Sequence, residues 1–301
     1  SDTKVFCENM IPRSGAANSE YFELRGREFL EAVCLVLAEI KGTLTFPDIY
    51  RAINLIPGGG EEYLNFAYEM SRSRFPLAVR VEEEIADSRK NPSNGFQGIM
   101  GELFKAFACL SDPVLMTSVS PPYDLSLSEL CSSEQKYQFY MMPPAEFINA
   151  WAPVIKAQFI SAMIYKSRNP QAPQQTWILD ECGQIGKFPL ITKLYTFGAG
   201  IGIRPVCIFQ SVFQMDALGQ NSGNIILSSA ALRSYFAVRD VASAQAVSNM
   251  IGAETLVYDD TRLQEQSRHA KRQAIQSILN GGDIMSAGLN YAHFRQQAEL
   301  P

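Results

Sequence analysis

The chain has 301 residues, of which 47% are hydrophobic and 19% charged, so it can bury a sizeable core and is not mainly disordered. Its 26 basic and 31 acidic residues give a net charge of -5, which excludes a polybasic nucleic-acid coat and restricts any DNA contact to a local surface. The six cysteines form no Cys-x-x-Cys pair and there are two histidines, so we expect reduced thiols and neither a zinc module nor a disulfide framework. No apolar run of about 18 residues occurs, and the chain does not start like a signal peptide, so we expect no membrane span within it.

The first third of the chain has helical periodicity. Residues 20–40 carry apolar side chains at the spacings of a single helix face, which predicts a core helix. Thr45 followed by Pro47 predicts the cap and first turn of a second helix, which we expect to end before Pro57. A turn follows, and residues 61–110 are typical of a compact helical block.

After Pro113 the pattern changes to short apolar runs bounded by proline, glycine or polar residues, which are typical of buried strands. Helical stretches separate these runs. The alternation predicts an α/β region with a mostly parallel sheet and crossover helices. The predicted strands are 137–144, 177–181, 205–211 and 234–240, and the predicted helices are 145–166, 187–197 and 240–251.

One predicted strand ends in Asp180 and Glu181, which is the form of a Walker B element. Ligands of open α/β sheets lie at the carboxyl ends of strands, where Asp180 would hold Mg²⁺ through water and Glu181 would polarise an attacking water. The tip of the next strand carries Gln210, which is placed to sense a γ-phosphate. An Asp-Glu pair is also typical of a helix N-cap, so the pair alone does not decide the role.

Four segments follow one another along the chain: ILDECGQIGKFP (178–189), the glycine-rich GAGIGIRP (198–205), IFQSVFQMDALG (208–219) and VRDVASAQAVSNMIGAET (238–255). In this order they resemble the motifs of one family, the TraG/TraD-type coupling proteins of conjugative type IV secretion systems, which are relatives of FtsK/HerA-like DNA translocases. The upstream segment EYFELRGREFLEAV and the segment LTFPDIYRAI resemble the passage leading into the all-α domain of that family.

The resemblance implies a fold and a set of site residues. The fold is an α/β RecA-like P-loop NTPase core, with a mostly parallel and partial sheet and an inserted all-α domain. Residues 1–40 and 113–301 would form the nucleotide-binding domain, and residues 41–112 the all-α domain. Asp180 would bind Mg-ATP, with Glu181 activating water and Gln210 sensing phosphate. Arg204 would be an arginine finger acting on a neighbouring subunit, or else a strand-end arginine that caps carbonyls or pairs with an acid.

The implied function is ATP-driven recruitment and translocation of DNA or relaxase-bound DNA. Its cofactors would be ATP and Mg²⁺, and its partners DNA, the relaxosome or secreted proteins, and components of the secretion channel. The intact protein would be a homo-hexamer at the cytoplasmic face of the bacterial inner membrane, with its anchor outside this chain.

The sequence departs from the family in one respect, because it contains no G-x-x-x-x-G-K-[ST] motif. We therefore expect this chain to begin after that motif and to lack ATPase activity alone. An alternative is a non-catalytic module that recognises substrate or relaxosome on a degenerate ATPase scaffold. A third hypothesis, an unrelated enzyme using Asp180 and Glu181 as an acid/base pair, is disfavoured because adjacent strand residues point to opposite faces.

Residues 261–295 have an excess of basic side chains. Five bases against two acids favour local phosphate contacts, but a solvated linker explains the same composition, and both interpretations stay open. The candidate nucleic-acid residues are Arg268, Lys271 and Arg272.

Overall fold

The structure of the chain is a computed structural model, and it describes residues 2–91, 93–236, 238, 241–252 and 261–279. The chain divides into two units, Ser1–Asp240 and Val241–Pro301, and each is described by itself. The first unit contains two hydrophobic cores, one formed mainly by helices and one built around two strands.

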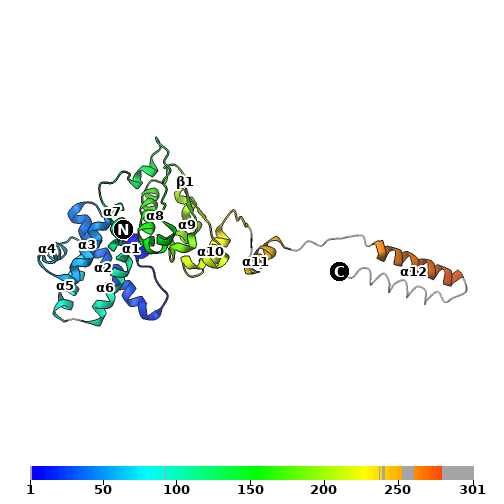
Figure 1. Cartoon of the computed structure of the whole chain (residues 1–301), viewed down its shortest axis with the longest axis horizontal. Coiled ribbons are helices and arrows are strands. Elements are labelled where there is room, and N and C mark those ends of the chain that lie inside the picture. The colour runs from blue at the N-terminus through cyan, green and yellow to red at the C-terminus, as the bar shows by residue number, and fades with distance from the viewer. Residues whose placement is uncertain (1, 92, 237, 239–240, 253–260, 280–301) are drawn as a thin grey trace. The chain divides into compact units, whose positions relative to one another are not determined.

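The first core is organised around a long helix, α2 (Ala17–Lys41), and Figure 1 shows the next four helices grouped around it. Its side chains Phe29, Leu30 and Val33 are completely buried, as expected from their spacing on one helix face. The predicted core helix and the helical block are thereby confirmed. The other helices of this part are α1 (Asp2–Met10), α3 (Phe46–Gly58), α4 (Glu61–Ser71), α5 (Pro76–Lys90), α6 (Asn94–Phe107) and α7 (Pro113–Ser118).

The start of α3 is as predicted, but its end is not. The Thr45 hydroxyl accepts a hydrogen bond from the Asp48 amide at 3.3 Å, so Thr45 is the N-cap. The helix runs through Pro57 to Gly58, so the prediction that it ends before Pro57 is wrong. The Gly59 amide donates to the Leu55 carbonyl at 3.1 Å, and this bond closes the last turn despite the missing proline N–H.

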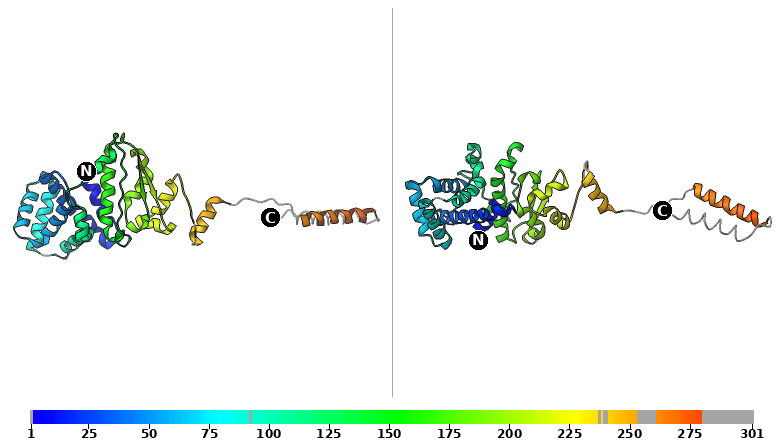
Figure 2. Two further views of the ribbon diagram at one scale, coloured as in Figure 1. Left: turned by 45° about the horizontal axis from the view of Figure 1, so that its top comes forward. Right: turned by 90° about the horizontal axis from the view of Figure 1, so that it is seen from below.

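Helix α8 (Ile148–Arg168) contributes to both cores of the first unit. Val154 and Ala157 belong to the helical core, whereas Ile160 and Met163 belong to the other, and Figure 2 shows α8 between the two groups of elements. Within the described ranges one segment, Ala145–Arg168, is long and apolar enough by composition to cross a membrane, with a mean hydropathy of 1.3. Because α8 buries side chains in both hydrophobic cores, we interpret it as a core helix.

The second core is built on a β-α-β unit. Strands β1 (Gln175–Leu179) and β2 (Ile203–Cys207) are parallel, with Gln175 opposite Ile203 and Leu179 opposite Cys207. Helix α9 (Pro189–Phe197) connects them, and α10 (Ser222–Ser229) follows. The Trp177 ring lies 5.3 Å from the Phe159 ring of α8, measured between centroids, so one face of the sheet is covered. Six short 3₁₀ turns also occur. They are η1 (Ala108–Ser111), which contributes Leu110 to the first core, and η2 (Leu127–Cys131), η3 (Ala145–Phe147), η4 (Cys182–Ile185), η5 (Gly198–Ile201) and η6 (Val212–Leu218).

Two of the four predicted strands are confirmed, as β1 and β2, and the predicted parallel pairing is correct. The strand predicted at 137–144 is wrong, and residues 234–236 and 238 of the strand predicted at 234–240 form none either. A strand needs a hydrogen-bonded neighbouring strand, and the sheet of the described residues consists of β1 and β2; Tyr140 of the first run is 70% exposed. The described chain is therefore mostly helical with a two-stranded parallel sheet, smaller than the predicted one.

The second unit contains α11 (Val241–Ile251) and α12 (Thr261–Leu279). Helix α11 confirms the helix predicted at 240–251, and the predicted helices at 145–166 and 187–197 correspond to α8 and α9. The domain boundaries after residues 40 and 112 stay predictions. The last residues of the basic segment, 280–295, lie outside the described residues.

Candidate functional site

The carboxyl ends of β1 and β2 bring the predicted site residues to one edge. The ladder continues past both strands, because the Ile208 amide donates to the Leu179 carbonyl and the Cys182 amide donates to the Ile208 carbonyl, each at 3.0 Å. Asp180 and Gln210 follow these paired residues closely. Polar side chains at the carboxyl edge of parallel strands occupy the place where α/β proteins bind ligands.

Glu181 has an unusual backbone conformation, with φ 48° and ψ 40° in the left-handed region. A non-glycine residue held there is strained by about 1–3 kcal/mol, and such strain is concentrated at functional sites. Two hydrogen bonds maintain the turn. The Glu181 amide donates to Asp180 Oδ1 at 3.0 Å, and the Gln184 amide donates to the Glu181 carbonyl at 2.9 Å.

The Glu181 carboxylate accepts hydrogen bonds from two glutamines. Gln210 Nε2 donates to Oε1 at 3.3 Å, and Gln184 Nε2 donates to Oε2. The Gln210 amide in turn donates to Gln214 Oε1 at 2.9 Å. The structure therefore brings Asp180, Glu181 and Gln210 together, and it adds two glutamines that sequence reasoning missed. Their signal was their spacing, three residues after Glu181 and four after Gln210, which places them on the adjoining 3₁₀ turns.

The two 3₁₀ turns of the site touch at Gly183. A Cβ atom on Gly183 would lie 2.8 Å from the Gln214 Cβ, which is closer than non-bonded carbon atoms approach. Only a glycine at this position lets η4 and η6 come this close. The close approach keeps Gln214 near the backbone of Gln210, and so fixes the end of β2 relative to Glu181.

Arg204 lies apart from these residues. It is opposite Thr176 in the sheet register, on the exposed face, four residues before the level of Asp180. At the rise of an extended strand this separation is about 13 Å. Among the described residues the Arg204 side chain has no hydrogen bond or ion pair, so neither the capping nor the pairing alternative is observed there. The structure does not bring Arg204 to the carboxylates of its own chain.

The glycine-rich segment packs against a buried lysine. Gly202 has φ 77°, and a Cβ atom there would lie 2.9 Å from Lys166 Nζ. The Lys166 side chain is completely buried, and its ammonium donates to the carbonyls of Asn169, Pro170 and Ala172 at 3.2, 3.2 and 2.9 Å. This cluster ends α8 and positions the chain for entry into β1.

The three candidate nucleic-acid residues lie on α12, in the second unit. Arg268, Lys271 and Arg272 are exposed, and their spacing of three and four residues places them on one side of the helix. The predicted basic surface therefore has a helical scaffold.

The fold and the site together define an α/β protein with a helical layer and a polar site at the carboxyl edge of its parallel strands. The family model for conjugative DNA transfer of the type IV secretory system matches residues 1–278, and the chain belongs to this family. The resemblance of the sequence motifs to conjugative coupling proteins is thereby confirmed.

Solved structures of one conjugative coupling protein share the fold. The bacterial protein TrwBdeltaN70 in complex with sulphate has 18% sequence identity and a TM-score of 0.51, with 76% of this chain and 51% of that chain covered. TrwB in complex with ADP and Mg²⁺ has 20% identity, a TM-score of 0.51 and the same coverage. Its complex with the ATP analogue ADPNP has 19% identity, a TM-score of 0.54 and again the same coverage. This chain thus spans about half the length of these structures, and no curated protein matches it.

Proposed function

We propose that this chain forms part of the motor of a conjugative coupling protein, which recruits DNA or relaxase-bound DNA and drives it toward a type IV secretion channel by hydrolysing ATP. The observation that carries the proposal is the hydrogen bond between Gln210 and Glu181, beside Asp180, in a chain of this family. The complexes of TrwB with ADP and Mg²⁺ and with ADPNP support a nucleotide as the ligand.

The proposed architecture follows from the same family. The β-α-β unit with α8 would belong to a RecA-like P-loop NTPase core, and helices α3 to α6 to an inserted all-α domain. Helix α8 buries side chains in both cores, which supports a fixed junction between the two domains. The intact protein would form a hexamer at the cytoplasmic face of the inner membrane and would contact relaxosome and channel components.

The residues at the edge fit Mg²⁺ with ATP. Asp180 offers a hard carboxylate oxygen that is exposed, and its second oxygen is fixed by the Glu181 amide. No group of three or more His, Cys, Asp or Glu side chains gathers within the described ranges, so Asp180 would hold the ion through water and phosphate oxygens, as Mg²⁺ prefers. The bound ion would neutralise charge on the β- and γ-phosphates.

Glu181 would accept a proton from the attacking water, and the glutamines would control when it does so. Gln184 holds one carboxylate oxygen and Gln210 holds the other. If the Gln210 amide turns toward a phosphate oxygen, Glu181 Oε1 becomes free to accept a hydrogen from water. Gln210 would thus link the arrival of the nucleotide to the activation of Glu181.

The test of catalysis uses the gene product that contains this chain, because these residues include no G-x-x-x-x-G-K-[ST] motif. Glu181→Gln should lower ATP turnover by about 10²- to 10⁴-fold while nucleotide affinity is retained. Glu134→Gln is the matched control, since Glu134 is exposed and distant in sequence from the site, and it should leave turnover unchanged. Equal turnover in both variants would contradict the motor and favour the non-catalytic recognition module.

Mixing two inactive variants tests the proposed role of Arg204. If Arg204 acts on the site of a neighbouring subunit, rings made from Arg204→Ala and Glu181→Gln subunits contain some intact sites and recover part of the turnover. If both residues act within one subunit, no intact site forms and the mixture stays inactive. The exposure of Arg204 and its separation from Asp180 support the first outcome.

The basic face of α12 is proposed to contact DNA phosphates. Replacing Arg268, Lys271 and Arg272 by glutamine should lower the slope of log affinity against log salt by about three, one for each phosphate that is no longer neutralised. The control replaces Arg51, Arg74 and Arg80 of the helical part by glutamine, which makes the same change in net charge. If both triple variants lower the slope equally, the change in net charge explains the effect, and α12 is rejected as the DNA-binding surface.

A further inference from the structure

Two cysteines adjoin the carboxylate edge on the covered side of the sheet. Cys182 directly follows Glu181 and is completely buried, and Cys207 is the last residue of β2 and is half-buried. The Cys182 amide donates to the Ile208 carbonyl at 3.0 Å, which holds the two backbone segments side by side. Both side chains lie in the second core, Cys182 within its buried cluster and Cys207 packed against that cluster, and the two thiols interact. A pair of thiols in contact is the starting geometry for a disulfide.

Tyr195 of α9 completes the environment of this pair. Its hydroxyl accepts a hydrogen bond from the Cys207 amide at 3.3 Å and also bonds the Cys207 side chain. The hydrogen bond from Cys182 lowers the pKa of Cys207, and the bond from Tyr195 lowers it further, against the opposing effect of burial. Cys182 is completely buried whereas Cys207 is partly exposed, so the pair is asymmetric, and Cys207 is the thiol that an oxidant reaches first.

The other four cysteines lack this combination. Cys7 and Cys34 also touch, but both are completely buried in the helical core, and burial raises the pKa of Cys7. Burial raises the pKa of Cys109 to about 11. Cys131 is half-buried and receives only a weak contact from Gln175 at 3.8 Å. Partial access, a partner thiol and a polarising hydroxyl meet only at Cys182 and Cys207 within the described residues.

We propose that Cys182 and Cys207 form a redox-active dithiol, which a peroxide closes to a disulfide. The Cys207 thiolate attacks the peroxide, the O–O bond breaks, and an alcohol or water leaves with the proton that Cys207 gave up, so Cys207 becomes a sulfenic acid. Cys182 sulfur then attacks the Cys207 sulfur, the S–O bond breaks and water leaves with the Cys182 proton. Two thiols and one peroxide give one disulfide, one alcohol or water, and one water.

The disulfide would act at the carboxylate edge. It would join the residue after Glu181 covalently to the end of β2, three residues before Gln210, and so alter the turn on which the Glu181–Gln210 hydrogen bond depends. Disulfides inside cells are mostly transient and redox-sensing, which suits a bond beside a working site. The proposal goes beyond the proposed function, and its test measures only the thiols, so either one can fail alone.

The experiment treats the 301-residue chain with one equivalent of hydrogen peroxide, blocks the remaining thiols by alkylation and maps tryptic peptides by mass spectrometry. We expect a cross-link between peptides 169–187 and 194–233, which contain Cys182 and Cys207, and a fall in the number of titratable thiols from six to four. Dithiothreitol should reverse both changes. A map in which Cys109 or Cys131 is oxidised while Cys182 and Cys207 stay reduced overturns the proposal.

Two variants separate the roles of the two thiols. Cys182→Ser should stop at the sulfenic acid, which dimedone then labels at Cys207, whereas Cys207→Ser should slow the first oxidation by about tenfold. Cys109→Ser is the matched control and should leave the cross-link unchanged. A Cys7–Cys34 cross-link in its place, or dimedone labelling equal at all cysteines, also overturns the proposal. The wild-type peptide map decides the matter without any variant.

Discussion

The helical half of the first unit, α2 to α6, and its strand half, β1, α9 and β2, differ in how completely they are covered. The helices bury their apolar faces on one another, and the first core lies within them. The two strands bury only one face. On the other face Ile178 is 66% exposed and Val206 is 44% exposed. Parallel strands are normally covered on both faces. The helical half therefore covers its own apolar surface, whereas the strand half leaves one apolar face of its sheet exposed.

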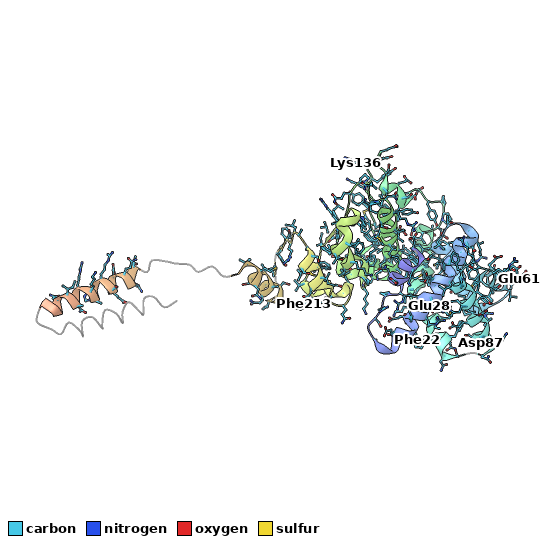
Figure 3. All side chains as sticks on the ribbon, turned by 180° about the vertical axis from the view of Figure 1, so that it is seen from behind. Phe22, Glu28, Glu61, Asp87, Lys136 and Phe213 are labelled. Carbon is cyan, nitrogen blue, oxygen red and sulfur yellow. The ribbon has the colours of Figure 1, made fainter. Side chains whose placement is uncertain are left out.

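The two halves also differ in what stabilises them. The helical half depends on many apolar contacts, none of which is critical by itself. Ion pairs lie at its surface, such as that of Arg80 with Glu28 at 3.2 Å; Glu28 is labelled in Figure 3. Surface pairs of this kind contribute little. The strand half depends on single close contacts, among them the buried ammonium of Lys166. We therefore expect single substitutions to cost more in the strand half than in the helical half.

Lys166→Ala should have the largest effect, lowering the free energy of unfolding by about 3–5 kcal/mol. The variant removes a buried stem and leaves the carbonyls of Asn169, Pro170 and Ala172 without their donor. Urea denaturation measures the change. Lys193→Ala is the control, because Lys193 is exposed on α9, and it should change stability by less than about 0.5 kcal/mol. If Lys166→Ala and Lys193→Ala lower the free energy of unfolding equally, the strand half does not depend on the contacts of the Lys166 ammonium.

Lys156→Met tests α8, the helix that both halves share. Among the described residues the Lys156 ammonium makes no hydrogen bond or ion pair, and burial lowers its pKa to about 8. Below that pH the folded chain bears a half-buried charge. The free energy of unfolding of Lys156→Met at pH 7 should therefore exceed that of the wild type by about 2–3 kcal/mol.

The pH dependence of Lys156 has a definite sign. Between pH about 8 and the ordinary lysine pKa near 10.4, the unfolded chain binds more protons than the folded chain. The free energy of unfolding of the wild type should therefore rise across this window, and that of Lys156→Met should not. Denaturation series at about pH 7 and about pH 10 make the comparison, and a rise of equal size in both proteins would contradict it.

The helical half could be predicted from the sequence because its signals are local. The apolar spacing of residues 20–40 and the cap at Thr45 each act within one or two turns of the chain. Part of the site could be predicted for a similar reason. Asp180 and Gln210 each follow a short apolar run, and parallel strands bring their carboxyl ends to one edge.

The remainder depends on contacts that a pattern of residue types does not encode. The run 137–144 has the composition of a strand, but within the part of the chain that the structure describes no strand pairs with it. The left-handed conformation of Glu181 is maintained by hydrogen bonds within its turn, including that of Gln184. Lys166 has the sequence context of a surface lysine near a helix end, and only the chain reversal after α8 encloses its ammonium among carbonyls.

Glycine substitutions compare the two halves at the scale of one methyl group. A Cβ atom on Gly198 would lie 2.9 Å from the Ile203 backbone carbonyl, and the backbone of a strand cannot move aside easily. On Gly98 of α6 it would lie 2.6 Å from the ring of Phe22, which is labelled in Figure 3 and is a half-buried side chain, not backbone.

We expect Gly198→Ala to lower the free energy of unfolding by about 1–2 kcal/mol. For Gly98→Ala the change should be smaller than about 1 kcal/mol, since alanine favours the helix while the Phe22 ring is displaced. Gly200→Ala is the control, as a Cβ atom there meets nothing within 4 Å. If Gly98→Ala is the more damaging variant, the helical half is the less tolerant one, and the comparison is reversed.

Thr45→Ala should have the smallest effect, a loss of about 1 kcal/mol. The Thr45 hydroxyl accepts from the Asp48 amide and donates to Asp48 Oδ2 at 2.8 Å, so its loss uncaps α3. Thr43→Ala, at an exposed position two residues earlier, should change little. Because α3 also buries Ile49 and Ile53 against the core, we expect fraying of its first turn and not loss of the helix. Hydrogen exchange should quicken only in that first turn; faster exchange throughout α3 would mean that the helical half depends on single contacts as well.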